Sequence, residues 1–159
     1  MTIAEKLNNH LDKLKGEIPE VAKQAILDNR GTIVNLVKFG QLSKGLNSDG
    51  LPLAWSKGTG FYAESTQGYA NRDRVSVPKS KGAPYNMSWT GQTLDNMYLE
   101  FVDVKKMTYE ISTVKFKKNL LEEIYGEIFN LTKEHNDWIN NNIIEPHVAK
   151  YIEENFFDF

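Results

Sequence analysis

The spacing of hydrophobic residues predicts two helices in the first 45 residues. Apolar side chains recur there every three or four positions, which places them on one face of a helix. Thr2 and Glu5 have capping-box spacing at the start of the first helix, and Gly16 is expected to end it. Pro19 suits the first turn of a second helix, which we expect to continue to about Lys44. The β-branched run at 32–34 would also suit a strand, although its neighbours keep helical spacing.

The next forty residues lack that regularity. A dense cluster of turn-forming residues at 45–50 predicts that the chain reverses, and Leu51–Trp55 suits a short strand. From Lys57 to Pro84 we find no apolar period of 2 or 3.6, and so we predict no helix or strand over these 28 residues. So long an irregular segment is typical of a functional loop or of an arm that a partner orders. We call residues 57–84 the arm.

Alternating apolar and polar residues predict a small antiparallel sheet after the arm. The three expected strands are Tyr85–Trp89, Met97–Val104 and Met107–Val114. Only a tight turn around Lys105 and Lys106 separates the last two, so they should form a hairpin. Helical spacing returns over Phe116–Tyr125 and from Thr132 to Ile152, where Pro146 must cause a break or kink.

This order of elements predicts the α+β class. A small antiparallel sheet of the 85–114 region would pack against N-terminal helices (1–45) and C-terminal helices (116–159), with the arm as a long irregular insertion. The length of 159 residues, with 40% hydrophobic and 25% charged residues, fits one domain over 1–159. The absence of cysteine excludes disulfides, thiolate zinc sites, iron–sulfur clusters and cysteine nucleophiles. We also expect no signal peptide and no membrane association, because the start has neither a basic region nor an apolar one of signal-peptide type, and no long apolar run occurs.

Catalytic and cofactor patterns occur only in the wrong context. Residues 58–63 match the loose dinucleotide pattern Gly-x-Gly-x-x-Ala, but no amphipathic helix follows to bind a pyrophosphate. Ser76–Lys79 matches Ser-x-x-Lys, but a proline within it opposes the helix that this motif needs. His10, His135 and His147 do not have metal-ligand spacing, and the polar residues around His135 favour a solvated helix start. We therefore predict no enzyme activity, no metal and no cofactor.

Charge and aromatic residues are distributed unevenly, although the net charge is only -2. The arm has an excess of three positive charges among its aromatic residues, and residues 132–159 have an excess of four negative charges. Both stretches would suit ordinary solvated surface, but they would also allow the arm of one copy to dock on the C-terminal part of the next. The contact residues would be Phe61, Tyr62, Tyr69, Arg72, Arg74, Lys79 and Lys81, facing Glu145, Glu153 and Glu154.

A series of short segments then points to a family. These segments are residues 41–50, Tyr62–Thr66, Lys79–Pro84, Trp89–Leu94 and Ile124–Thr132. In this order they resemble small virion proteins of tailed bacteriophages, and the nearest group is the tail-completion or head-to-tail joining proteins, which include neck ring proteins. The resemblance spans roughly residues 33–152 and implies a small antiparallel sheet on helices, assembled as a ring beneath the portal.

The resemblance and the residue pattern together predict a structural, non-enzymatic virion protein. The resemblance implies a ring of 6 or 12 copies in the neck or tail, assembled in the host cytoplasm and contacting portal, adaptor and tail proteins. Genomic DNA would at most pass through its lumen. The alternative function is a nucleic-acid-binding module, in which the basic and aromatic residues of the arm clamp a strand.

Overall fold

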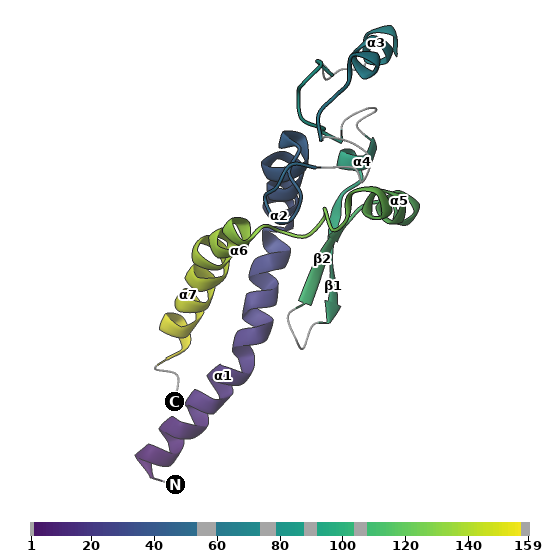
Figure 1. The fold of residues 1–159 in the computed structure, drawn as a ribbon. Helices are drawn as coiled ribbons and strands as arrows, with labels where there is room; N and C mark the ends of the chain where they lie inside the picture. The colour runs from purple at the N-terminus through teal and green to yellow at the C-terminus, as the bar shows by residue number, and fades with distance from the viewer. Residues whose placement is uncertain (1, 54–59, 74–78, 88–91, 104–107, 157–159) are drawn as a thin grey trace.

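The computed structural model describes residues 2–53, 60–73, 79–87, 92–103 and 108–156, and it is mostly helical (Figure 1). Its longest element, α1 (Ile3–Asp28), begins with the predicted capping box. The backbone N–H of Glu5 donates to Thr2 Oγ1 at 3.2 Å, and that of Thr2 donates to Glu5 Oε2 at 2.6 Å. These two bonds satisfy backbone donors that a helix start otherwise leaves without partners.

The prediction that Gly16 ends the first helix is wrong. Helix α1 continues through Gly16 and Pro19 for 26 residues, and its buried residues lie along its length. They include Leu14, Ala22, Ala25 and Ile26. Burial of this continuous apolar stripe outweighs the cost of one glycine and one proline in the helix, which together amount to about 4 kcal/mol.

Helical structure continues to Lys44, as predicted, and excludes the strand alternative at 32–34. It consists of α2 (Arg30–Asn35), the π-helix η1 (Leu36–Gln41) and the 3-10 helix η2 (Leu42–Lys44). Gly45 ends the run in the left-handed conformation, at φ 75°. The predicted reversal follows, with Asn47 N–H donating to the Leu51 carbonyl at 2.8 Å. Residues 51–53 form only an isolated bridge, and 54–55 lie outside the described residues, so the predicted strand at 51–55 is absent where it can be seen.

The hairpin prediction is confirmed with shorter strands. The strands β1 (Tyr98–Asp103) and β2 (Thr108–Ser112) pair antiparallel, with Leu99 opposite Ile111 and Phe101 opposite Tyr109. The predicted turn at 105–106 lies outside the described residues. A short helix, α4 (Gln92–Asp95), precedes β1. The predicted strand at 85–89 is wrong for residues 85–87, which belong to no strand, while 88–89 are not described.

The predicted break or kink at Pro146 is not a gap in the helix, because residues 133–155 are helical throughout and the helix only changes from π to α just before Pro146. Helix α5 (Lys115–Tyr125) is followed by α6 (Lys133–Ile139), the π-helix η3 (Asn140–Ile144) and α7 (Glu145–Asn155). Pro146 lies in the first turn of α7, where a missing N–H leaves no helical hydrogen bond unmade.

One hydrophobic core joins the helices to the hairpin, which gives the predicted α+β arrangement. Its fully buried members come from α1, α2, η1, α6 and the segments that link them. They are Ala25, Ile26, Ile33, Val37, Leu42, Leu53, Ile128, Phe129 and Ile139. The face of the hairpin that carries Leu99, Phe101 and Ile111 packs against this core.

Helix α7 lies beside part of the longer helix α1 (Figure 1). His10 Nε2 is 2.8 Å from the Asn155 carbonyl, and the Tyr151 hydroxyl donates to Glu17. These contacts fix α7 along the N-terminal half of α1.

The molecule exposes more surface than a compact chain of its size. Its accessible surface is 10245 Å², whereas a compact monomer of 18.2 kDa exposes about 8,100 Å². The ribbon shows why, because α1 extends to one end and α3 (Glu64–Asp73) lies at the opposite end (Figure 1). The excess of about 2,000 Å² is similar to the total area that a stable protein interface buries.

Candidate functional site

The arm leaves and rejoins the rest of the molecule through a short paired stem. Tyr62 N–H donates to the Ala83 carbonyl, and Gly82 N–H donates to the Tyr62 carbonyl, both at 2.9 Å. Tyr85 N–H donates to the Gly60 carbonyl at 3.0 Å, and Phe61 bridges to Pro84. These backbone bonds hold the two ends of the arm together.

The prediction that the arm contains no regular element is wrong, because α3 occupies its outer part. Glu64 in the first turn and Arg72 in the last turn suit the helix dipole. The returning chain holds this helix, since Lys81 N–H donates to Gln67 Oε1 at 2.9 Å and Lys81 Nζ lies 3.0 Å from Glu64 Oε2. Ala70 is the only buried residue among those of α3. A helix without an apolar stripe gives no periodic signal, so the sequence pattern missed it.

Two aromatic residues of the arm are exposed, and a third is half-buried. Phe61 is 44% exposed and Tyr69 is 55% exposed. The guanidinium of Arg72 lies 5.0 Å from the centre of the Tyr69 ring and 3.0 Å from the carboxylate of Asp73. Tyr62, in contrast, is half-buried, and its hydroxyl donates to Asn86 Oδ1 at 3.0 Å. Phe61 and Tyr69 therefore remain available to a partner, whereas Tyr62 supports the stem.

The structure places Lys79 in a setting that the sequence did not suggest. We expected an exposed cation facing an acidic partner, but this residue is only 2% exposed. Its ammonium contacts Asn86 Oδ1 and lies 5.3 Å from the centre of the Tyr62 ring. Burial lowers the pKa of this ammonium. Lys79 is thus internal to the arm and presents no charge to a partner in this structure.

The predicted acidic partners lie on α7, at a distance from the arm. Glu145, Glu153 and Glu154 are all exposed, and Lys150 lies 3.8 Å from Glu154. None of the residues of α7 is buried. In Figure 1 helix α7 lies beside α1, while α3 is at the opposite end of the molecule, so one chain does not bring the two surfaces together. Arg74 lies outside the described residues.

A polar junction between η1 and α6 was missed by the sequence reasoning. Gln41 is fully buried; its amide donates to the Asn130 carbonyl at 2.9 Å, and its Oε1 accepts from Thr132 N–H at 3.2 Å. His135 Nδ1 lies 2.8 Å from the same Oε1, so it is the protonated nitrogen. The predicted solvated helix start is confirmed, since α6 begins at Lys133 and Glu134, Asn136 and Asp137 are exposed. The ring of His135 itself is half-buried and bonded to Gln41, which was not expected. Its pKa is lowered by burial, and Lys44 lowers it further, while Glu134 opposes the shift.

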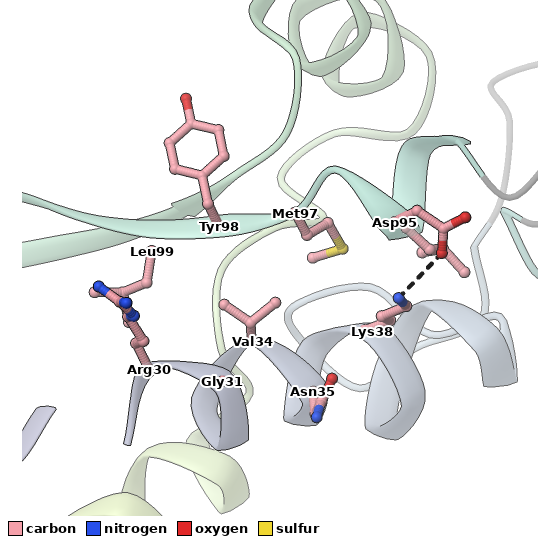
Figure 2. A pocket seen from close by; sticks show the side chains of 10 residues that line it. Arg30, Gly31, Val34, Asn35, Lys38, Asp95, Met97, Tyr98 and Leu99 are labelled. Atoms are coloured by element: carbon pink, nitrogen blue, oxygen red, sulfur yellow. Dashed lines mark hydrogen bonds and ion pairs between the residues drawn. The ribbon is translucent and has the colours of Figure 1, made fainter. Parts of the chain in front are cut away.

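A groove of about 390 Å³ separates the start of α2 from β1 (Figure 2). Val34, Met97 and Leu99 form its apolar part, and Lys38 Nζ lies 3.3 Å from Asp95 Oδ1 across one end. Because Lys38 and Asp95 already pair with each other, this pair offers no free acid or base to a ligand in the groove. In the described part of the chain no group of three His, Asp or Glu residues could hold a metal ion.

Comparison with protein-family models, with curated proteins and with solved structures finds no match to this chain. Of the described helices, none combines the length and the apolar character that crossing a membrane requires.

Proposed function

We propose that this chain is a structural subunit that assembles head to tail into a ring, as the neck ring of a tailed bacteriophage does. The observation that carries the proposal is the position of the arm and of α7 at distant parts of one molecule (Figure 1). Two different surfaces that cannot meet within a chain can meet between copies. Contacts of this heterologous kind generate closed rings or open filaments.

The exposed residues at the two surfaces support a contact of this kind. Phe61 and Tyr69 offer exposed aromatic surface, which is enriched at protein interfaces and supplies much of their binding energy. Helix α7 offers Glu145 and Glu153, which form no ion pair within the described residues, together with half-exposed Val148 and Ile152. Arg72 lies beside Tyr69 and pairs with Asp73, but its side chain is 70% exposed, so it could also face a carboxylate of α7 and favour one orientation of the two copies.

The large accessible surface also supports an assembled state. The excess of about 2,000 Å² over a compact monomer is enough for one interface of standard size. In the proposed ring, the neighbours outside the subunit would be portal, adaptor and tail proteins, and the subunit would act without enzyme activity or cofactor. The resemblance to head-to-tail joining proteins supports this location in the virion.

The alternative of nucleic-acid binding has less support than the ring. Clamping a strand needs cations that are free to meet phosphates. Among the described residues of the arm, Lys79 is buried, Lys81 pairs with Glu64 and Arg72 pairs with Asp73. After these two pairs the excess of three positive charges still remains; it consists of Lys79, which is buried, and of Lys57 and Arg74, which lie outside the described residues.

Two classes of variant test the head-to-tail contact. The double variant Phe61→Ser with Tyr69→Ser removes the exposed aromatics of the arm, and Glu145→Lys with Glu153→Lys reverses the acidic face of α7. We expect the wild-type chain to form closed oligomers in mass photometry and each variant to remain monomeric. Tyr98→Ser is the matched control, because Tyr98 is also exposed, at 45%, but lies on β1.

Mixing the two variants distinguishes a head-to-tail contact from a symmetric one. The arm variant keeps an intact α7 face, and the α7 variant keeps an intact arm. One contact can therefore form between the two variants, and we expect heterodimers and no larger species. Oligomers of the arm variant at wild-type size would contradict the proposal. A control variant that also fails to assemble would likewise contradict it, because the effect would then not belong to the arm.

A further inference from the structure

Lys79 is a buried cation with no counter-ion among the residues that the structure describes. Its side chain is 2% exposed, and its ammonium contacts the amide oxygen of Asn86 and the aromatic face of Tyr62. Within the described part of the chain no carboxylate forms an ion pair with it. An ammonium has three N–H donors, and burying its charge without an ionic partner is unfavourable. A reaction that removes the charge would remove this cost.

The side-chain amide of Asn86 is the group positioned to react with Lys79. Its Oδ1 contacts Lys79 Nζ and also accepts a hydrogen bond from the Tyr62 hydroxyl at 3.0 Å. The Tyr62 oxygen in turn accepts from Asn86 N–H at 3.1 Å, so hydroxyl and amide are fixed relative to each other. The ring of Tyr85 lies 5.0 Å from that of Tyr62 and helps to enclose the site. An amine and an amide carbonyl thus meet in a partly dry, aromatic setting.

We propose that Lys79 and Asn86 condense within the chain into an isopeptide bond. The neutral amine Nζ attacks Asn86 Cγ, and a new Nζ–Cγ bond forms. The Cγ–Nδ2 bond then breaks, Nδ2 takes up the proton that Nζ gives up, and ammonia leaves. No oxidant, reductant or second substrate is needed, because one amide replaces another.

Tyr62 would assist this step by stabilising the negative charge that develops on Oδ1. Its hydroxyl already donates to that oxygen in the structure, and it can keep the same bond to the carbonyl oxygen of the product. Burial lowers the pKa of Lys79, which increases the fraction of the neutral amine that attacks. Because no carboxylate pairs with Lys79 in the described residues, proton transfer depends on solvent, and we expect the reaction to be slow and faster at higher pH.

The mass of the intact, full-length chain tests the proposal. Freshly purified protein is incubated at about pH 7 and at about pH 9, and intact-mass spectrometry follows the loss of about 17 Da, the mass of ammonia. We expect the loss to approach one per chain and to be faster at the higher pH. No loss after prolonged incubation at the higher pH would overturn the proposal.

Peptide mapping identifies the bond. The new amide protects Lys79 from trypsin, so digestion should give a branched peptide in which residues 75–81 are joined to residues 82–105. Cyclisation of an asparagine to a succinimide also releases ammonia, but it leaves these two peptides separate. A loss of about 17 Da without the branched peptide would therefore overturn the proposal.

Three variants locate the chemistry. Lys79→Arg keeps the positive charge but should abolish the mass loss, whereas Lys81→Arg, the matched control two residues away, should react at the wild-type rate. Tyr62→Phe should slow the reaction about a hundredfold, which is the usual effect of removing one donor to a developing oxyanion. Mass loss that persists in Lys79→Arg would exclude Lys79 as the attacking group. The branched peptide of the wild-type chain decides the question even where a variant fails to fold.

Discussion

The arm and the rest of the molecule, which we call the body, are held together by different interactions. In the body, side chains such as Ala25, Ile33 and Val37 are fully buried in one apolar core. In the arm, order depends on backbone pairing at the stem and on polar contacts such as Lys81 with Glu64. Ala70 is the only apolar side chain that is buried among the described residues of the arm.

This difference implies that the stability of the fold and the recognition of a partner depend on different parts of the molecule. Removing apolar atoms from a packed core leaves a cavity, so the body should be sensitive to truncation of single side chains. The exposed aromatics of the arm contribute little to the folded monomer, so they can be changed or used by a partner at small cost to stability. We expect the body to set the free energy of unfolding and the arm to set the association.

The largest expected difference in the free energy of unfolding is between variants of two phenylalanines, one in the body and one in the arm. Phe129→Ala, in the body at 1% exposure, should lower the free energy of unfolding by about 3–5 kcal/mol, because it opens a cavity in the core. Phe61→Ala, in the arm at 44% exposure, should lower it by less than about 1 kcal/mol. Urea titration followed by circular dichroism measures both. Equal losses for the two variants would show that the arm is part of the cooperative core.

A smaller difference in stability is expected between variants of two glycines, one in the body and one in the arm. A Cβ at Gly40, in the body, would lie 2.7 Å from Cε1 and 2.9 Å from Nε2 of His135, whose ring is held by Gln41. Gly40→Ala should therefore destabilise the protein by about 1–3 kcal/mol.

Gly68→Ala, in α3 of the arm, is the matched control because nothing lies within 4 Å of the added methyl group. Alanine favours a helix over glycine by about 0.5–1 kcal/mol, so amide exchange in α3 should slow while global unfolding hardly changes. Unchanged stability in Gly40→Ala would mean that the His135 ring moves away without cost.

The smallest effect concerns pH. Burial holds the pKa of His135 in the folded protein below its unfolded value of 6.5. The unfolded chain then binds the proton more readily, so stability should fall as the pH drops from 6.5 through the lower folded pKa. His135→Asn can keep a donor for Gln41 but does not titrate, so its unfolding free energy should fall less between pH 7 and pH 5.5. Identical slopes for variant and wild type would contradict this assignment.

Local sequence determined most of the elements of the body. Two examples are the capping box of Thr2 and Glu5 and the alternation of residues 98–103, each of which depends on neighbours a few positions away. Such signals can be read from a single chain, because hydrogen bonds and side-chain periodicity within one element depend on nearby residues. The α+β class followed from the same signals.

Where local signals conflicted or were absent, only the tertiary structure decided which conformation the chain adopts. Helix α1 passes through Gly16 because its apolar stripe packs continuously, and α3 forms without a stripe because the returning chain holds it through Lys81. Gln41 meets His135 across 94 positions of sequence, and Lys79 is buried beside an amide and an aromatic ring. Contacts between distant residues carry no periodic trace in the sequence, because they depend on how finished elements pack rather than on how each one forms.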